Sequence, residues 1–229
     1  MNLIFYFNKI KNTGILINSK KSQIRKFSSN NKSLALLRNE KNGYNWYLSQ
    51  RRISQKNLKT EPTKKYPFLD FTLIKGKEVS YSSFLSENYD YAKKVLIYYK
   101  DFWPSKFITP SHGDLTFANI IFLKNRIEII DWENFVSKKE WGYDISYFLI
   151  SSLTLPFIIK KKTVIQNKEL LIFEKLWKNF FKNSNFSYTH NPIKYIKNSV
   201  KSDNLRNYKK FFLNKLSGYQ IDQIKEITN

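Results

Sequence analysis

The chain has 229 residues, of which 41% are hydrophobic and 17% aromatic, a composition that excludes a disordered chain and is sufficient for a packed core. It contains no cysteine and only two histidines, so a disulfide framework and a thiolate zinc site are excluded, whereas a hard ion held by oxygen atoms is not. The formal net charge of +22 attracts anions, but it does not choose among nucleotides, nucleic acid and an acidic membrane surface.

The first segment predicts a small antiparallel meander. Residues 3–7 form an apolar run that is too short for a signal peptide and has no basic region before it, so we expect a strand and a cytoplasmic protein. Residues 14–18 and 23–27 also have the composition of strands, and the polar residues 19–22 between them predict a turn.

A helix is expected after the meander. Ser33 has the residue type of an N-cap, and the helix should continue through Glu40 towards Trp46, although Gly43 weakens the prediction. A strand is predicted at residues 68–74. We place the junction between a small N-lobe, residues 1–75, and a larger C-lobe, residues 76–229, directly after this strand.

Most of the C-lobe has a helical pattern. Apolar residues between positions 81 and 102 suit helices that end at Trp103, and residues 170–180 have the spacing of an amphipathic helix. Residues 145–159 are strongly apolar but too short to span a membrane comfortably, and they contain Pro156. We therefore expect a buried helix there and no transmembrane segment.

The middle of the chain contains the candidate catalytic and metal-binding residues. Two apolar runs around residues 124–125 predict a hairpin, which would bring Asn119 opposite Ile130 or Asp131, depending on register. Asp114 lies a short loop before the same open end. Two carboxylates and one carboxamide are thus expected to converge, and oxygen ligands of this kind suit Mg²⁺, which completes its coordination with phosphate oxygens and water.

This stretch resembles the aminoglycoside phosphotransferase and choline kinase family. The family signature is a His-Gly-Asp loop, an asparagine five residues later and an Ile-Asp-Trp/Phe-Glu segment, and here these are residues 112–114, Asn119 and residues 130–133. Asp144, in a Gly-Tyr-Asp sequence, is similar to the family's later structural aspartate. The resemblance covers the chain from Ser111 to about Asp144.

The resemblance implies a two-lobed, protein-kinase-like α+β fold with a small antiparallel-sheet N-lobe and a mainly helical C-lobe. It also implies transfer of the γ-phosphate of ATP or GTP to a hydroxyl of a small acceptor, such as a sugar, an amino alcohol or a glycolipid precursor. In this interpretation Asp114 is the catalytic base, His112 supports its loop, and Asn119 and Asp131 bind Mg²⁺, while Glu133 is structural.

A kinase of this type needs a cation on the nucleotide phosphates, usually a strand lysine paired with a glutamate of the following helix. Lys26 and Glu40 fit this role, whereas Arg25 would point to the opposite face of its strand. The chain departs from the family in one respect. Gly14 is the only glycine before Gly43, so no glycine-rich phosphate loop is present.

The C-terminal region favours an anionic acceptor because it is rich in lysine, at Lys160, Lys161, Lys162, Lys168, Lys194 and Lys197. Two other functions stay open. One is a catalytically silent kinase-like scaffold. The other is a basic protein that binds RNA or single-stranded DNA through lysines and exposed aromatic residues, although no nucleic-acid motif is recognised and nucleic acid is the less favoured partner.

Overall fold

The structure is a computed structural model that describes residues 3–9, 11–51, 59–60, 67–182, 192–194 and 215–228. The chain forms two compact units. Unit 1 comprises Met1–Lys77 and Ile121–Val136, and unit 2 comprises Glu78–Ile120 and Ser137–Asn229. The chain therefore returns to unit 1 in the middle of the sequence. The division into functional lobes at residue 75 stays a prediction.

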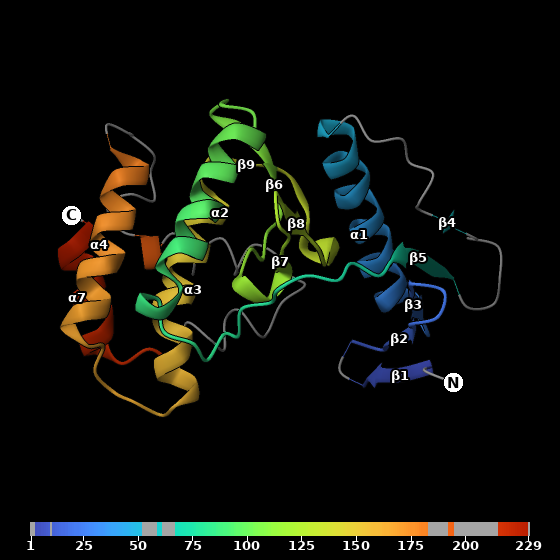
Figure 1. Cartoon of the computed structure of the whole chain (residues 1–229), viewed down its shortest axis with the longest axis horizontal. Coiled ribbons are helices and arrows are strands. Elements are labelled where there is room, and N and C mark those ends of the chain that lie inside the picture. Colours follow the sequence, from blue (N-terminus) through green and yellow to red (C-terminus); the bar gives the residue numbers. More distant parts are fainter. Residues whose placement is uncertain are drawn as a thin grey trace. The chain divides into compact units, whose positions relative to one another are not determined.

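Unit 1 contains a five-stranded sheet in the order β1-β2-β3-β5-β4, and each neighbouring pair of strands is antiparallel. The strands are β1 (Leu3–Asn8), β2 (Thr13–Asn18), β3 (Gln23–Ser28), β4 (Lys59–Thr60) and β5 (Phe68–Thr72). The predicted meander of three strands and the turn between the second and third are confirmed. Figure 1 shows β1, β2 and β3 in blue and β5 in teal.

The register of the sheet places two neighbouring basic residues on opposite faces. Lys26 lies in the middle strand β3, between Ile15 on β2 and Leu69 on β5. Arg25 points to the other face, where its guanidinium donates two hydrogen bonds to the carboxylate of Asp70, at 2.6 and 2.7 Å. The predicted alternation is thus confirmed, and it leaves Lys26 as the basic residue on the face that α1 covers.

Helix α1 (Asn31–Gln50) begins with a capping box. The side chain of Asn30 accepts a hydrogen bond from the Ser33 N–H (2.9 Å), and Ser33 Oγ accepts one from the Asn30 N–H (3.2 Å). The prediction of Ser33 as N-cap is wrong, because Asn30 is the cap and Ser33 is the third residue of the helix. Reciprocal bonding across three residues makes both side chains part of the helix start.

A hairpin that is distant in sequence completes unit 1. Strands β7 (Ile120–Phe122) and β8 (Ile127–Ile129) pair with each other, and the Leu123 N–H donates to the carbonyl of Arg126 (2.9 Å) at the turn. This confirms the predicted hairpin. A short 3₁₀ helix, η4 (Trp132–Asn134), follows β8 after two residues, Ile130 and Asp131.

Gly43 allows α1 to approach η4 closely. A Cβ atom at this position would lie 2.7 Å from Cβ of Phe135 and 2.8 Å from Cβ of Trp132. One helical turn further on, the ring of Tyr47 lies 5.1 Å from that of Trp132. The helix continues through Gly43 without interruption. The glycine therefore does not end the helix, and its lack of a side chain allows the close contact with η4.

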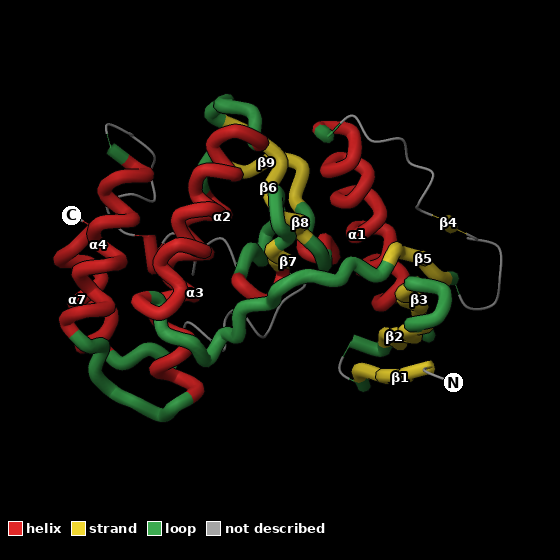
Figure 2. Tube along the Cα trace, viewed as in Figure 1, coloured by secondary structure: helices red, strands yellow, loops and turns green. Residues whose placement is uncertain are grey.

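Unit 2 is mainly helical, as predicted (Figure 2). Its long helices are α2 (Tyr89–Phe102), α3 (Tyr143–Ile159), α4 (Asn167–Phe181) and α7 (Gly218–Thr228). Almost every residue of α3 is buried, including Pro156, which confirms the expected buried helix. No helix in the described ranges is both long and apolar enough to cross a membrane.

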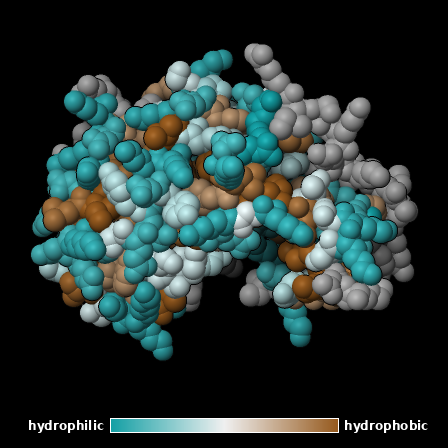
Figure 3. All heavy atoms as spheres, in the orientation of Figure 1, coloured by the Kyte–Doolittle hydropathy of each residue, from teal (hydrophilic) through white to brown (hydrophobic). Residues whose placement is uncertain are grey.

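The positive charge lies at the surface of the protein. No lysine of the described residues is in the buried class, and Figure 3 shows hydrophilic residues over much of the visible face. Because aliphatic stems of lysine can cover apolar surface while the ammonium stays in water, this charge is compatible with the packed cores of both units.

We expect Gly43→Ala to lower the free energy of unfolding by about 1–3 kcal/mol, because the added methyl group has no space against Phe135 and Trp132. Alanine ordinarily stabilises a helix interior by about 1 kcal/mol relative to glycine, so the sign itself is informative. Urea denaturation measures the effect. Gly218→Ala is the control, since nothing lies within 4 Å of a Cβ there. Equal effects of the two substitutions would contradict the packing argument.

Candidate active site

The ammonium of Lys26 binds two carboxylates within unit 1. Its Nζ donates to Oε1 of Glu40 at 2.6 Å and to Oδ1 of Asp131 at 2.7 Å. The Lys26 and Glu40 side chains are 17% and 3% exposed, whereas that of Asp131 is 31% exposed. The predicted pair of Lys26 and Glu40 is confirmed, and the participation of Asp131 is an additional finding. Their role in nucleotide binding stays a prediction.

This cluster has more negative than positive charge. Burial by itself lowers the pKa of Lys26, but the charges of Asp131 and Glu40 raise it above its ordinary value, so the ammonium stays protonated. Burial raises the pKa of Glu40 to about 7; Lys26 opposes this shift and the charge of Asp131 adds to it. One ammonium therefore does not neutralise both carboxylates, and a further cation beside the more exposed Asp131 would be stabilised.

Asp131 has an uncommon backbone conformation. Its φ of 62° and ψ of 57° lie in the left-handed region, which few residues other than glycine adopt. The residues that follow are fixed by Asn39 of α1, whose Nδ2 donates to the carbonyls of Glu133 and Phe135, both at 2.8 Å. Such conformations concentrate at functional sites, where surrounding contacts maintain them.

A second ion pair in unit 1 joins the turn between β1 and β2 to the segment after Asp131. Nζ of Lys11 donates to Oε1 of Glu133. Burial lowers the pKa of Lys11, but the charge and hydrogen bond of Glu133 raise it above its ordinary value. Lys11 could not be predicted from the sequence, because nothing in the local pattern distinguishes it from the other lysines.

In unit 2, one buried carboxylate organises the His-Gly-Asp loop. Strand β6 (Ile108–Ser111), which enters the loop, pairs with β9 (Val136–Glu140), which precedes α3. Asp144, in the first turn of α3, is fully buried and accepts hydrogen bonds from Ser111 Oγ (2.8 Å) and from the N–H groups of residues 112 (2.8 Å) and 113 (2.9 Å). The contacts agree with the structural role expected for Asp144.

His112 also supports the loop. It is fully buried, and its Nδ1 accepts a hydrogen bond from the N–H of Asp114 at 3.2 Å, which leaves the imidazole proton on Nε2. Gly113 has a φ of 77°, a conformation that glycine adopts without strain. The loop thereby presents Asp114 in a conformation that is set by its neighbours.

Asn119 is held next to the backbone of Asp114. It ends the 3₁₀ helix η3 (Phe117–Asn119), and its Nδ2 donates to the carbonyl of Asp114 at 2.8 Å. This bond uses the nitrogen end of the carboxamide, so the oxygen end is the group that suits a cation. Asp131 belongs to unit 1, and its predicted convergence with Asp114 and Asn119 stays a prediction.

The described carboxylate and histidine side chains do not by themselves form a complete metal site. In the part of the chain that the structure describes, no group of three or more His, Cys, Asp or Glu side chains is arranged to hold a metal ion. An ion bound by Asn119 or Asp131 would therefore take most of its oxygen ligands from phosphate and water. This is the usual coordination of Mg²⁺ in phosphoryl-transfer sites.

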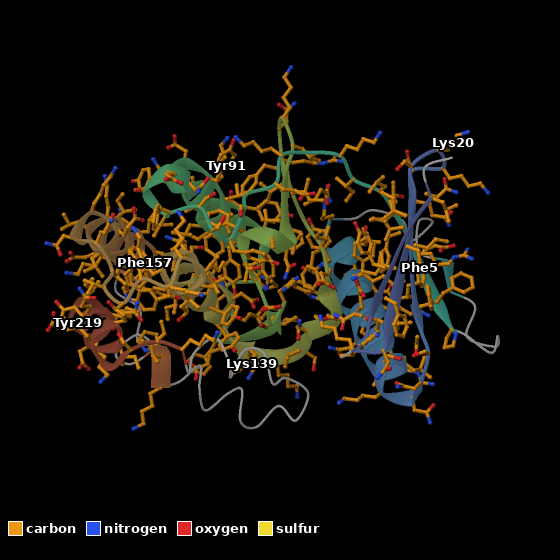
Figure 4. The ribbon with its side chains drawn as sticks, turned by 90° about the horizontal axis from the view of Figure 1, so that it is seen from below. Phe5, Lys20, Tyr91, Lys139, Phe157 and Tyr219 are labelled. Carbon is orange, nitrogen blue, oxygen red and sulfur yellow. The ribbon has the colours of Figure 1, made fainter. Side chains whose placement is uncertain are left out.

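A small hollow in unit 2 is lined in part by Thr116, two residues after Asp114. Its volume is about 10 Å³, the room of about one water molecule, and none of its lining side chains is charged. Within the described residues, the buried Oγ of Ser152 has no hydrogen-bond partner. Figure 4 shows the helices of this unit around Phe157, on the same helix as Ser152. The lining residues are Tyr81, Ser83, Thr116, Phe117, Ser151, Ser152 and Leu155.

We expect Asp144→Ala to destabilise the protein by about 3 kcal/mol or more, because three hydrogen bonds from the loop to a buried carboxylate are lost; the N–H of residue 113 keeps a second acceptor, Ser111 Oγ. Urea denaturation measures the loss. The control is Asp101→Ala, at an exposed position of α2, which should change stability by less than about 0.5 kcal/mol. A small effect of Asp144→Ala would show that the loop does not depend on this carboxylate.

The raised pKa of Glu40 predicts how stability depends on pH. Because the folded-state value of about 7 exceeds the ordinary value of 4.5, the contribution of Glu40 is complete below about pH 4.5 and is lost as the pH rises to about 7. Glutamine imitates the protonated side chain. We therefore expect Glu40→Gln to match wild type near pH 4.5 and to exceed its stability at pH 8 by at most about 3 kcal/mol.

Urea denaturation of wild type and Glu40→Gln across this pH range tests the expectation. Glu226→Gln, at an exposed position of α7, is the control and should follow wild type throughout. If Glu40→Gln were the less stable protein at pH 8, the attraction of Lys26 would outweigh burial and the charge of Asp131.

No family model matches the chain, and no curated protein matches it. Among solved structures, the chain is similar to one described as amicoumacin kinase hAmiN in complex with AMP-PNP, Ca²⁺ and Ami. The two are 12% identical, with a TM-score of 0.50, over 97% of this chain and 91% of that chain. The likeness shows the fold, so the predicted kinase-like, two-lobed α+β class is confirmed. The particular family stays a prediction.

Proposed function

We propose that the chain is a small-molecule kinase that transfers the γ-phosphate of ATP or GTP to a hydroxyl group, with Mg²⁺ as cofactor. The observation that carries the proposal is the cluster of Lys26, Glu40 and Asp131. A strand lysine paired with a helix glutamate, beside a metal-binding aspartate, is the arrangement by which kinases hold nucleotide phosphates. The complex of the similar kinase with AMP-PNP and Ca²⁺ supports the use of a nucleotide and a divalent cation.

In the proposed reaction, residues of unit 1 bind the metal ion and the phosphate oxygens. Asp131 is a ligand of Mg²⁺, which neutralises charge on the phosphate oxygens when bound. With the Asp131 carboxylate directed to the cation, the Lys26 ammonium would donate to phosphate oxygens and keep its hydrogen bond to Glu40. The raised pKa of Lys26 ensures that this donor is protonated at neutral pH.

Unit 2 supplies the base and a second metal ligand. Asp114 accepts the proton of the acceptor hydroxyl as that oxygen forms a bond to the γ-phosphorus and the bond to the nucleoside diphosphate breaks. Asn119, which hydrogen-bonds the Asp114 carbonyl, contributes its side-chain oxygen to Mg²⁺. His112 and Asp144 act through the loop that they hold, and neither needs to transfer a proton.

Lysines gather beside one aromatic ring of unit 2. The ammonium groups of Lys160 and Lys162 lie 3.7 and 5.5 Å from the centre of the Phe84 ring. The small hollow nearby in sequence has no charged lining residue, and its volume of about 10 Å³ is too small to hold an acceptor.

These lysines favour an anionic group on the acceptor, for example a sugar or a glycolipid precursor that carries a phosphate. Lys161, Lys168 and Lys194 are exposed residues of the same unit. Lys197, which also contributed to the prediction of an anionic acceptor, lies outside the described residues.

Two substitutions should separate binding from chemistry. We expect ATP or GTP with Mg²⁺ to raise the melting temperature of wild type. At a ligand concentration one hundred times Kd, the free energy of unfolding should rise by about 2.7 kcal/mol. Asp131→Ala should lose the magnesium-dependent part of this shift. Asp114→Ala should keep the shift but lose transfer by about 10²–10⁴-fold, because only the general base is removed.

Thermal denaturation with each nucleotide, followed by an acceptor screen among phosphorylated sugars and glycolipid precursors, makes the test. Asp101→Ala serves as the control for loss of a surface carboxylate. Transfer that survives in Asp114→Ala would reject the assigned base. Absence of any nucleotide shift in wild type would reject the proposal in favour of a silent scaffold or a polyanion-binding protein.

A further inference from the structure

Two main-chain groups of the turn between β1 and β2, the Lys11 N–H and the Asn12 carbonyl, take part in hydrogen bonds. The N–H of Lys11 donates to the side-chain oxygen of Asn8 at 3.0 Å. Asn12 has a φ of 53°, and its carbonyl accepts hydrogen bonds from the N–H (3.2 Å) and Oγ (2.9 Å) of Ser29, just before α1. The turn is thereby anchored to the start of α1, and the Lys11 amide is already used.

The side chain of Lys11 extends from this anchored turn into the charged cluster. Its ammonium pairs with Glu133, which follows Asp131 by two residues, and the two side chains are 32% and 10% exposed. The charge of Asp131 raises the pKa of Lys11 and that of Lys26 lowers it, so these three groups lie within electrostatic range of one another. All of them belong to unit 1.

The cluster has the charge pattern of a binding site for a metal–phosphate complex. It contains two ammonium groups and three carboxylates, which sum to a net charge of −1 when all are ionised (+2 − 3). The carboxylates would repel an anion bound alone, and the ammonium groups would repel a cation bound alone. A ligand that combines a cation with anionic oxygens can pair the cation with the carboxylates and the oxygens with the ammonium groups. The members are Lys11, Lys26, Glu40, Asp131 and Glu133.

We propose that Lys11 binds the β- and γ-phosphate oxygens of the nucleotide through its side-chain ammonium, in the place of the main-chain amides of a glycine-rich loop. The inference rests on the proposed function. An ammonium has three N–H donors, so Lys11 can keep one hydrogen bond to Glu133 while it donates to phosphate. Glu133 is then a positioning residue, which holds the Lys11 ammonium close to Asp131.

Calorimetric titration of ATP, ADP and AMP with Mg²⁺ tests this assignment in the full-length protein. Lys11→Gln should weaken ATP and ADP binding about tenfold to hundredfold, the range for loss of a charge-assisted hydrogen bond. It should leave AMP binding unchanged, because AMP has neither phosphate. Lys20→Gln is the matched control. Lys20 is exposed in the turn between β2 and β3, at the opposite end of β2 from Lys11 (Figure 4), and its loss should leave all three affinities unchanged.

The same titrations separate failure of the inference from failure of the proposed function. Wild type that binds none of the nucleotides would reject both. Wild type that binds ATP with Mg²⁺, together with a Lys11→Gln variant of equal affinity, would overturn only the role of Lys11. An equal loss of AMP and ATP affinity would also overturn it, since the effect would then not depend on the β- and γ-phosphates.

Removal of Lys11 leaves the largely buried Glu133 without this ammonium, so the single variant could lose stability. A double variant, Lys11→Gln with Glu133→Gln, removes both charges and restores neutrality. If Lys11 binds phosphate, the double variant should still bind ATP about tenfold to hundredfold more weakly than wild type. Recovery of wild-type ATP affinity in the folded double variant would overturn the proposal.

Discussion

The ammonium of Lys26 connects three parts of unit 1 that are far apart in the sequence. Strand β3 supplies the lysine, α1 supplies Glu40, and the end of the β7–β8 hairpin supplies Asp131. Buried ion pairs contribute little net stability, because desolvation offsets much of the Coulomb attraction. The surplus carboxylate, with the pKa of Glu40 raised to about 7, makes this cluster less favourable than one balanced pair. Stability alone therefore does not account for the composition of this cluster.

Helix α1 makes several contacts to the segment around Asp131 from one of its sides. Asn39 binds two carbonyls after Asp131, and Gly43 provides the space for Trp132. The hydroxyl of Tyr47 donates to Glu128 and accepts from the N–H of Ile129, each at 3.2 Å. Asn39, Gly43 and Tyr47 are each four residues apart and thus share a helix face. The left-handed residue Asp131 lies between the segments that these side chains contact.

The features that sequence could predict are those that depend on local pattern. Alternation of side chains placed Arg25 and Lys26 on opposite faces of a strand, and the motif spacing identified Asp114 with Asn119. The N-cap prediction was wrong by three residues, because Ser33 has the residue type of a cap but takes part from the third helical position, bonded to the cap Asn30. Local pattern could not show that Lys26 reaches Asp131 across more than one hundred residues, because that contact depends on tertiary packing.

Lys11 illustrates a different limit, because it is one of 40 basic residues and its significance comes only from its position. A glycine-rich loop holds phosphate through several N–H groups in a fixed geometry, which requires backbone conformations that glycine permits. The turn here uses its main chain to attach itself to Ser29, so its rigidity comes from those bonds. A lysine on such a turn has a backbone held in place by those hydrogen bonds, a flexible aliphatic side chain and a compact ammonium charge. Recognition by that ammonium would depend on charge and distance more than on direction, and salt would weaken it in proportion to its exposure.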